Sequence, residues 1–321
     1  MKPRKNRCLA RIILSGIIIQ FALWVNTAWA KDINSKAGTS AFSFLKVDFS
    51  ARAVAMGGAF TGLANDESAL YYNPAGVASF EENRYILAYH NYFVDLQSGF
   101  AGYIHRLGED ISLGGWMSYM NYGEFIETDI SGNTLGAFGG GNLVTAVTVA
   151  VQKHYNLTLG GTVKFIYERV QNFSGTGMAV DVGIKYAGDR ERRSVGLVIQ
   201  NLGTQFSGLG SEKDQLPLTV RGGIAVRPRS FPLTLAADLL LPIDNNLEFA
   251  IGSEYYEFKP LYLRLGWNSF GSNFRTANSD DHWAGFSLGV GFDINKMHIS
   301  YAFSPSADLG ESHRVTLTGG F

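Results

Sequence analysis

The stretch His313-Arg-Val-Thr-Leu-Thr-Gly-Gly-Phe321 decides the fold. Neighbouring side chains of an extended strand point to opposite faces. The apolar residues of this stretch share one face: Val315, Leu317 and Phe321. Arg314, Thr316 and Thr318 share the other. An alternating strand that ends on an aromatic residue is typical of the strand that closes a membrane β-barrel. We therefore expect Val315, Leu317 and Phe321 to form the signal read by the barrel-assembly machinery.

The other end of the chain predicts export. Basic residues from Lys2 to Arg7 precede an apolar run over 12–25, and Ala28-Trp29-Ala30 offers a small-x-small cleavage site. This order is that of a signal peptide, which we place at 1–30, and the run is too short for a membrane helix. Export and a closing strand together predict integration into the outer membrane of a diderm (Gram-negative-type) bacterium, in contact with its lipid.

Composition excludes several classes of function. The 321 residues carry a net charge of only −1, so we expect no nucleic-acid partner. The one cysteine, Cys8, lies in the signal segment, so the mature chain has no disulfide. No mature stretch approaches 18 unbroken apolar residues, which excludes helical membrane spans. The six histidines show no metal-like pairing, so we expect no metal, and no phosphate or dinucleotide motif suggests a cofactor.

The chain from Arg84 onward divides into segments with period-2 alternation, which is the pattern of a transmembrane barrel. We count fourteen such segments, at 84–92, 97–106, 111–121, 143–153, 157–169, 177–187, 193–200, 217–227, 233–241, 247–257, 261–269, 283–294, 297–304 and 313–321. Short turns alternate with longer loops such as 122–142. The sequence therefore predicts an all-β, fourteen-stranded antiparallel barrel over 84–321, with both mature termini periplasmic because the strand count is even.

The charged residues fall almost wholly on one face of these strands. A charge that faces lipid at mid-depth costs about 2–4 kcal/mol, so this face must line the lumen. The expected lumenal charges are Lys164, Asp181, Lys185, Arg221, Glu248, Glu254, Arg264, Asp293 and Arg314. A soluble β-sandwich is the alternative, but it fits the export signal and the closing strand less well.

Residues 31–83 do not alternate and hold the most distinctive sequence. It runs Phe44-Leu45-Lys-Val-Asp-Phe-Ser-Ala-Arg52-Ala-Val-Ala-Met56-Gly57-Gly58-Ala-Phe60, and later Asp66-Glu-Ser-Ala-Leu-Tyr71-Tyr72-Asn73-Pro74-Ala75-Gly76-Val77. The Gly-Gly pair permits sharp backbone geometry, and Pro74–Gly76 forms a turn. A small and apolar segment of this kind needs support, so we expect a hatch folded into the lumen.

This motif resembles the long-chain fatty-acid transporter (FadL-type) superfamily, and more closely its PorV/PorQ branch. The resemblance implies an N-terminal hatch that plugs the barrel. It also implies assistance to protein export of the type IX secretion kind, by engaging secreted proteins or other secretion components. The alternative is FadL-like uptake of long-chain fatty acids or other hydrophobic molecules. A structural or adhesion barrel is a third possibility, and a plugged lumen favours it least.

Several residues are candidates for latching or gating the hatch. Arg52 is positioned in sequence to bind a lumenal carboxylate (Glu248, Glu254 or Asp293) or an acidic ligand group; the plainer reading is a structural ion pair. The other hatch and gating candidates are Met56, Gly57, Gly58, Asn73, Pro74, Ala75 and Gly76. The Asn73–Gly76 turn either gates a ligand path or simply seats the hatch at the periplasmic mouth.

Two further groups of residues invite a functional interpretation. The aromatic residues of the hatch line a greasy pocket or form its core: Phe42, Phe44, Phe49 and Phe60. His282 beside Asp280 and Asp281 imitates a catalytic group, but an extracellular loop is rich in such residues. We expect no enzymatic activity.

Overall fold

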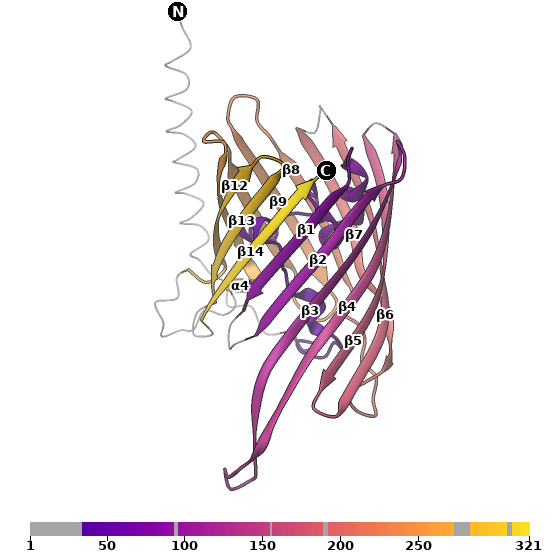
Figure 1. Cartoon of the computed structure of the whole chain (residues 1–321), viewed down its shortest axis with the longest axis vertical. Coiled ribbons are helices and arrows are strands. Elements are labelled where there is room, and N and C mark those ends of the chain that lie inside the picture. The colour runs from indigo at the N-terminus through magenta and orange to yellow at the C-terminus, as the bar shows by residue number, and fades with distance from the viewer. Residues whose placement is uncertain (1–33, 93–95, 155, 189–191, 273–282, 307–309) are drawn as a thin grey trace, which may run out of the picture.

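The computed structural model describes residues 34–92, 96–154, 156–188, 192–272, 283–306 and 310–321. Fourteen strands form one closed antiparallel barrel in which β1 pairs with β14 (Figure 1). The strands are β1 (Arg84–Asn91), β2 (Gln97–Arg106), β3 (Ile111–Thr128), β4 (Thr134–His154), β5 (Leu157–Val170), β6 (Phe173–Gly188), β7 (Arg193–Ser207), β8 (Thr219–Val226), β9 (Leu233–Pro242), β10 (Glu248–Tyr255), β11 (Leu261–Asn268), β12 (Phe286–Ile294), β13 (Met297–Pro305) and β14 (Glu311–Gly320). The fold class predicted from alternation is confirmed. The expected signal peptide lies outside the described residues.

The wall of the barrel alternates as the sequence predicts. In β14, Val315 is exposed on the outside while Arg314, Thr316 and Thr318 are buried on the inside. The register of the seam runs from Arg84 opposite Gly320 to Asn91 opposite His313, so the sheet closes without a gap. Outward apolar side chains on every strand form a surface suited to lipid. Within the described residues, no helix has the length and apolar character to cross a bilayer.

The two ends of the barrel differ. We call the end that holds Arg84 and Phe321 the closing end, and the opposite end, where β3 and β4 project far beyond the other strands, the hairpin end (Figure 1). The turn at the tip of this hairpin is held by Asp129, whose Oδ1 accepts from the backbone N–H of Ser131 and of Asn133 at 2.8 Å each.

The projecting hairpin corrects the prediction of a loop over 122–142. The glycines and polar residues of this stretch suggested irregular structure, yet they continue both strands past a register shift between Asn121 and Glu124. Cross-strand packing supports the extension, because the rings of Phe125 and Phe138 stack with centroids 5.4 Å apart.

The N-terminal segment (residues 34–83) lies inside the barrel, where its short helices are visible in Figure 1. These are η1 (Ser43–Lys46), α2 (Ala51–Ala55), α3 (Ala69–Tyr72) and η2 (Pro74–Ser79); α4 (Ser269–Ser272) follows β11. The segment begins at the hairpin end, where Asn34 Nδ2 donates to Asn246 Oδ1 at 3.4 Å, and runs to β1 at the closing end. Asn34 thus lies at the hairpin end and Phe321 at the closing end, because the segment traverses the lumen. Residues 31–33, where the mature chain is expected to begin, lie outside the described residues, so the periplasmic position of both termini stays a prediction.

Glycines on the inner wall let the segment approach closely. A methyl group on Gly252 of β10 would collide with the backbone of Met56, and one on Gly160 of β5 with the backbone of Pro74. Such close approach of two backbones is open only to glycine. The wall is therefore shaped for this segment and leaves no layer of side chains between them at these points.

Candidate functional site

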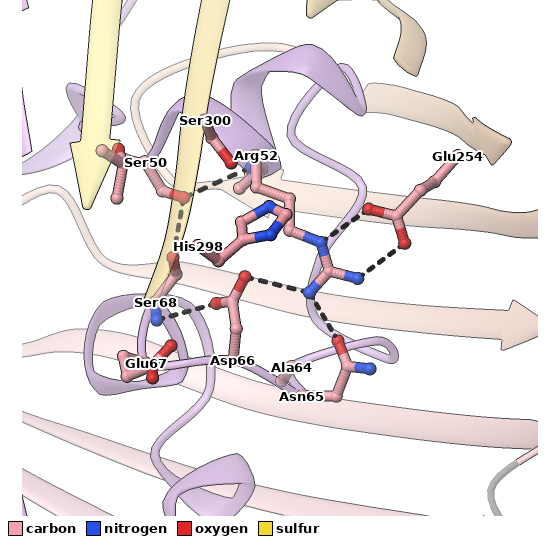
Figure 2. A network of polar contacts seen from close by, with 12 residues as sticks. Ser50, Arg52, Ala64, Asn65, Asp66, Glu67, Ser68, Glu254, His298 and Ser300 are labelled. Atoms are coloured by element: carbon pink, nitrogen blue, oxygen red, sulfur yellow. Dashed lines mark hydrogen bonds and ion pairs between the residues drawn. The ribbon is translucent and has the colours of Figure 1, made fainter. Parts of the chain in front are cut away.

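The most developed polar site in the lumen centres on Arg52 of α2 (Figure 2). Its Nε and Nη2 donate to the two carboxylate oxygens of Glu254 in β10, at 2.8 Å each. Its Nη1 donates to Asp66 and to Asn65 at 2.9 Å each. Burial opposes the charge of Arg52, but Glu254 and Asp66 outweigh it and raise the pKa of Arg52. A bidentate pair of this geometry fixes the segment to the wall.

A hydrogen-bonded chain continues from Glu254 toward the closing end. Arg264 Nε donates to Glu254 at 2.8 Å, and its Nη2 donates to His298 Nε2 at 2.9 Å. A guanidinium has no acceptor, so Nε2 must accept and the proton of His298 sits on Nδ1, which faces Asp293. Tyr262 donates to the other oxygen of Asp293 at 2.6 Å. The pair of Arg52 with Glu254, which we call the latch, is thus supported by residues of β11, β12 and β13.

Of the three carboxylates considered for Arg52, the structure pairs it with Glu254. Asp293 reaches Arg52 only through His298, Arg264 and Glu254. Glu248 lies near the hairpin end, where its Oε1 accepts from Asn245 at 3.1 Å, and belongs to a different part of the lumen.

Other charged residues of the wall bind the backbone of the segment. Arg221 Nη2 donates to the Gly58 carbonyl at 2.8 Å, Lys185 to that of Ala64 at 2.7 Å, and Arg314 to that of Asp48 at 2.9 Å. Asp238 Oδ2 accepts from the N–H groups of Phe60 and Thr61 at 3.0 and 2.8 Å. These contacts satisfy backbone groups that the segment, with little regular structure, leaves unpaired.

Asp238 was missed by sequence reasoning. The available signal was a lone carboxylate at an inward-facing position of the apolar strand β9, between Ala236 and Leu240. Lys164 and Asp181, in contrast, pair within the wall at 2.7 Å, and Lys164 also donates to Asn201 at 2.8 Å. This pair stabilises the wall at β5–β7 and takes no part in the latch.

The Asn73–Gly76 turn lies against the wall near the closing end. Asn73 Nδ2 donates to the carbonyls of Thr61 and Ile184 at 3.0 and 3.3 Å, and its Oδ1 accepts from the Ala75 N–H at 3.2 Å. Asn73, Pro74, Ala75 and Gly76 are all buried. Met56, Gly57 and Gly58 are buried too, and Met56 and Gly57 contact β10 and β11. The turn seats the segment on the wall; whether it also gates a path stays a prediction.

The aromatic residues of the segment form a core with the wall. Phe49 stacks on Phe100 of β2 with ring centroids 3.5 Å apart, and Phe100 stacks on Trp116 of β3 at 5.3 Å. Phe42, Phe49 and Phe60 are buried in this core, and Phe44 packs against it. The aromatic cluster therefore connects the interior of the lumen to β2 and β3.

The outer face of the wall carries an apolar depression over β14, β1, β2 and β3. It has a volume of about 440 Å³ and is lined by Leu87, Ala88, Tyr89, Gly99, Phe100, Ala101, Met117, Tyr119, Val315 and Leu317. Phe100 borders the depression, but its side chain is only 3% exposed and its ring belongs to the inner aromatic core. In the part of the chain that the structure describes, no group of three metal-ligating side chains occurs; His282, Asp280 and Asp281 lie outside it.

Comparison with known proteins identifies the architecture. No family model and no curated protein matches the chain. Among solved structures, a deltaS2S3 mutant of the TodX monoaromatic hydrocarbon channel aligns with a TM-score of 0.58 at 14% identity over 85% of this chain and 99% of that one. The CymD monoaromatic hydrocarbon channel aligns at 0.56 and 12% identity over 88% and 99%. A Pseudomonas aeruginosa FadL homologue aligns at 0.52 and 12% identity over 91% and 99%.

These likenesses show the fold alone, a barrel like those of the TodX and CymD channels and of the FadL homologue. They give no support to the PorV/PorQ branch in particular, so that finer resemblance stays a prediction.

Proposed function

We propose that this protein is a non-enzymatic outer-membrane channel that admits small hydrophobic compounds. The observation that carries the proposal is the aromatic core of the lumen, which packs on the inner face of β2 and β3 where the outer face of a FadL-type barrel carries an apolar depression. The solved structures of this fold include channels named for monoaromatic hydrocarbons and a toluene transporter. In this reading the closing end faces the periplasm, and the surrounding partner is outer-membrane lipid.

A filled lumen suits an apolar solute better than a hydrophilic one. The segment is pinned to the wall by charged contacts on β6, β8, β10 and β14, so it occupies lumenal space that ions and sugars would need. An apolar solute needs only local rearrangement of side chains such as Phe49 and Phe100. In this proposal the charged contacts hold the segment in place, and the aromatic core provides the route for the solute.

Engagement of secreted proteins is a second candidate, and the projecting hairpin is the observation that favours it. Ile126 is 70% exposed and Leu135 64% exposed on this hairpin, well beyond the rim of the barrel. Exposed apolar side chains of this kind mark interaction surfaces. They do not explain the aromatic core inside the barrel, so we place this candidate second.

An uptake experiment in whole cells tests the proposal, because an intact outer membrane excludes hydrophobic compounds that cross simple liposomes unaided. Radiolabelled toluene and a long-chain fatty acid would be supplied to a host that lacks channels of this fold, with and without this protein. We expect faster initial uptake of at least one compound and unchanged uptake of a sugar. If cells with and without the protein take up every hydrophobic compound at the same rate, the proposal is refuted and a role in protein export is favoured.

A further inference from the structure

A second feature of the lumen, separate from the latch, is an internal cavity toward the hairpin end. It has a volume of about 130 Å³ and lies between the N-terminal segment and the strands β7 to β11. The segment contributes Leu45 and Tyr71 to its apolar part, and β9 contributes Leu240. An apolar protein cavity of about 150 Å³ is known to hold benzene, so this one matches a single small ring in size.

The cavity is not uniformly apolar, because four charged side chains line it: Lys46, Asp48, Arg221 and Glu248. Lys46 is neutralised by Asp244, which its ammonium meets at 2.6 Å. Arg221 is 3.5 Å from Asp238, yet its buried Nε–H has no hydrogen-bond partner within the described residues. An unpaired buried donor is costly and marks a place for an acceptor.

The two carboxylates at the cavity supply acceptors. Glu248 receives one hydrogen bond, from Asn245, and keeps further acceptor capacity. Burial raises the pKa of Asp48, and Arg221, Tyr72 and Arg314 oppose the shift. A site in which a carboxyl group itself resists ionisation favours an uncharged ligand over an anionic one.

We propose that this cavity binds a small hydrophobic solute that carries one neutral hydroxyl group, with the ring against Tyr71 and Leu240 and the hydroxyl between Arg221 and Glu248. The inference rests on the proposed function and narrows its class of substrate. A hydroxyl accepts a hydrogen bond from the guanidinium and donates one to the carboxylate. A hydrocarbon of the same shape leaves both unpaired, and a carboxylate in place of the hydroxyl has no proton to donate to Glu248.

Phenol, toluene and benzoate distinguish these cases, because they share one ring and differ in the attached group. Each would be titrated into the detergent-solubilised full chain at pH 7 by isothermal calorimetry. Sites built to bind a hydroxyl discriminate strongly against analogues that lack it. We expect saturable phenol binding that is at least tenfold tighter than that of toluene or benzoate. Equal or tighter toluene binding overturns the inference, as does absence of phenol binding.

Three variants test whether the binding takes place in the cavity. Leu240→Phe adds volume inside it and should abolish phenol binding, whereas Leu239→Phe adds the same volume on the exposed outer face of β9 and should not. Glu248→Gln keeps the shape and replaces an acceptor oxygen by an N–H donor, so it should strengthen benzoate binding several-fold. Heat-modifiable gel mobility checks folding, and unchanged phenol binding in Leu240→Phe refutes the assignment to this cavity.

The outcome is separable from that of the uptake experiment. Failure of phenol binding with toluene uptake intact removes the hydroxyl preference and leaves the channel. Failure of uptake with phenol binding intact leaves a binding site in a barrel of another function.

Discussion

Replacement of Arg52 by alanine tests the latch most directly. The substitution removes four charge-assisted hydrogen bonds, two to Glu254, one to Asp66 and one to Asn65. Removal of one partner from a buried ion pair costs about 3–5 kcal/mol. Glu254 keeps Arg264 as a partner, so we take the lower limit of about 3 kcal/mol. This shifts the equilibrium between docked and released segment by on the order of 100-fold.

Planar-bilayer recording measures this release. We expect Arg52→Ala to open longer and more often than the wild type, because a released segment leaves the lumen conductive. Arg169→Ala is the matched control, since Arg169 is exposed and its Nε donates only to the Gln171 carbonyl, at 3.0 Å. Wild-type conductance together with wild-type heat-modifiable gel mobility in Arg52→Ala would show that the pair with Glu254 does not hold the segment.

Three further predictions concern other contacts. Burial raises the pKa of Glu67 from 4.5 to about 7, with Asp66 adding to the shift and Arg84 opposing it. The stability from this group is complete below pH 4.5 and lost as pH rises through about 7, so channel openings should be more frequent at pH 8.5 than at pH 5.5, and Glu67→Gln should flatten this dependence. Gly252→Val should displace the segment at Met56 and raise conductance, while Gly99→Ala, with open space on the outer wall, should not. Phe321→Ala removes a ring that lies 6.1 Å from Tyr103 and should lower the yield of folded barrel in membranes; an unchanged yield on gels would exclude an assembly role.

The barrel was predictable because its physics is local. Period-2 alternation and the cost of a charge in lipid are read along one strand at a time, and they gave the strand count and the inward face. The extension of the β3–β4 hairpin was not predicted, because glycine-rich stretches are typical of loops. Phe125 and Phe138 stabilise it by packing against each other across the two strands, which is not visible along one strand.

The site was less predictable because its ion pairs depend on how far along the lumen each residue lies. Glu248 and Glu254 lie on the same strand and the same face, so sequence could not rank them as partners of Arg52. Only the three-dimensional path of the segment, set by close contacts such as that of Met56 with Gly252, brings α2 level with Glu254. Asp238 was overlooked for a related reason, since its ligands are backbone N–H groups, which carry no sequence signature.

The seam between β1 and β14 has a consequence for the order of folding. β1 follows the N-terminal segment directly, and its partner β14 comes from the far end of the chain. The ring of hydrogen bonds therefore closes only after all the other strands exist, when β14 pairs with β1, and β1 is tethered to the segment. Enclosure of the segment and completion of the ring are coupled, so a substitution that weakens docking should also slow the final step by which the barrel matures.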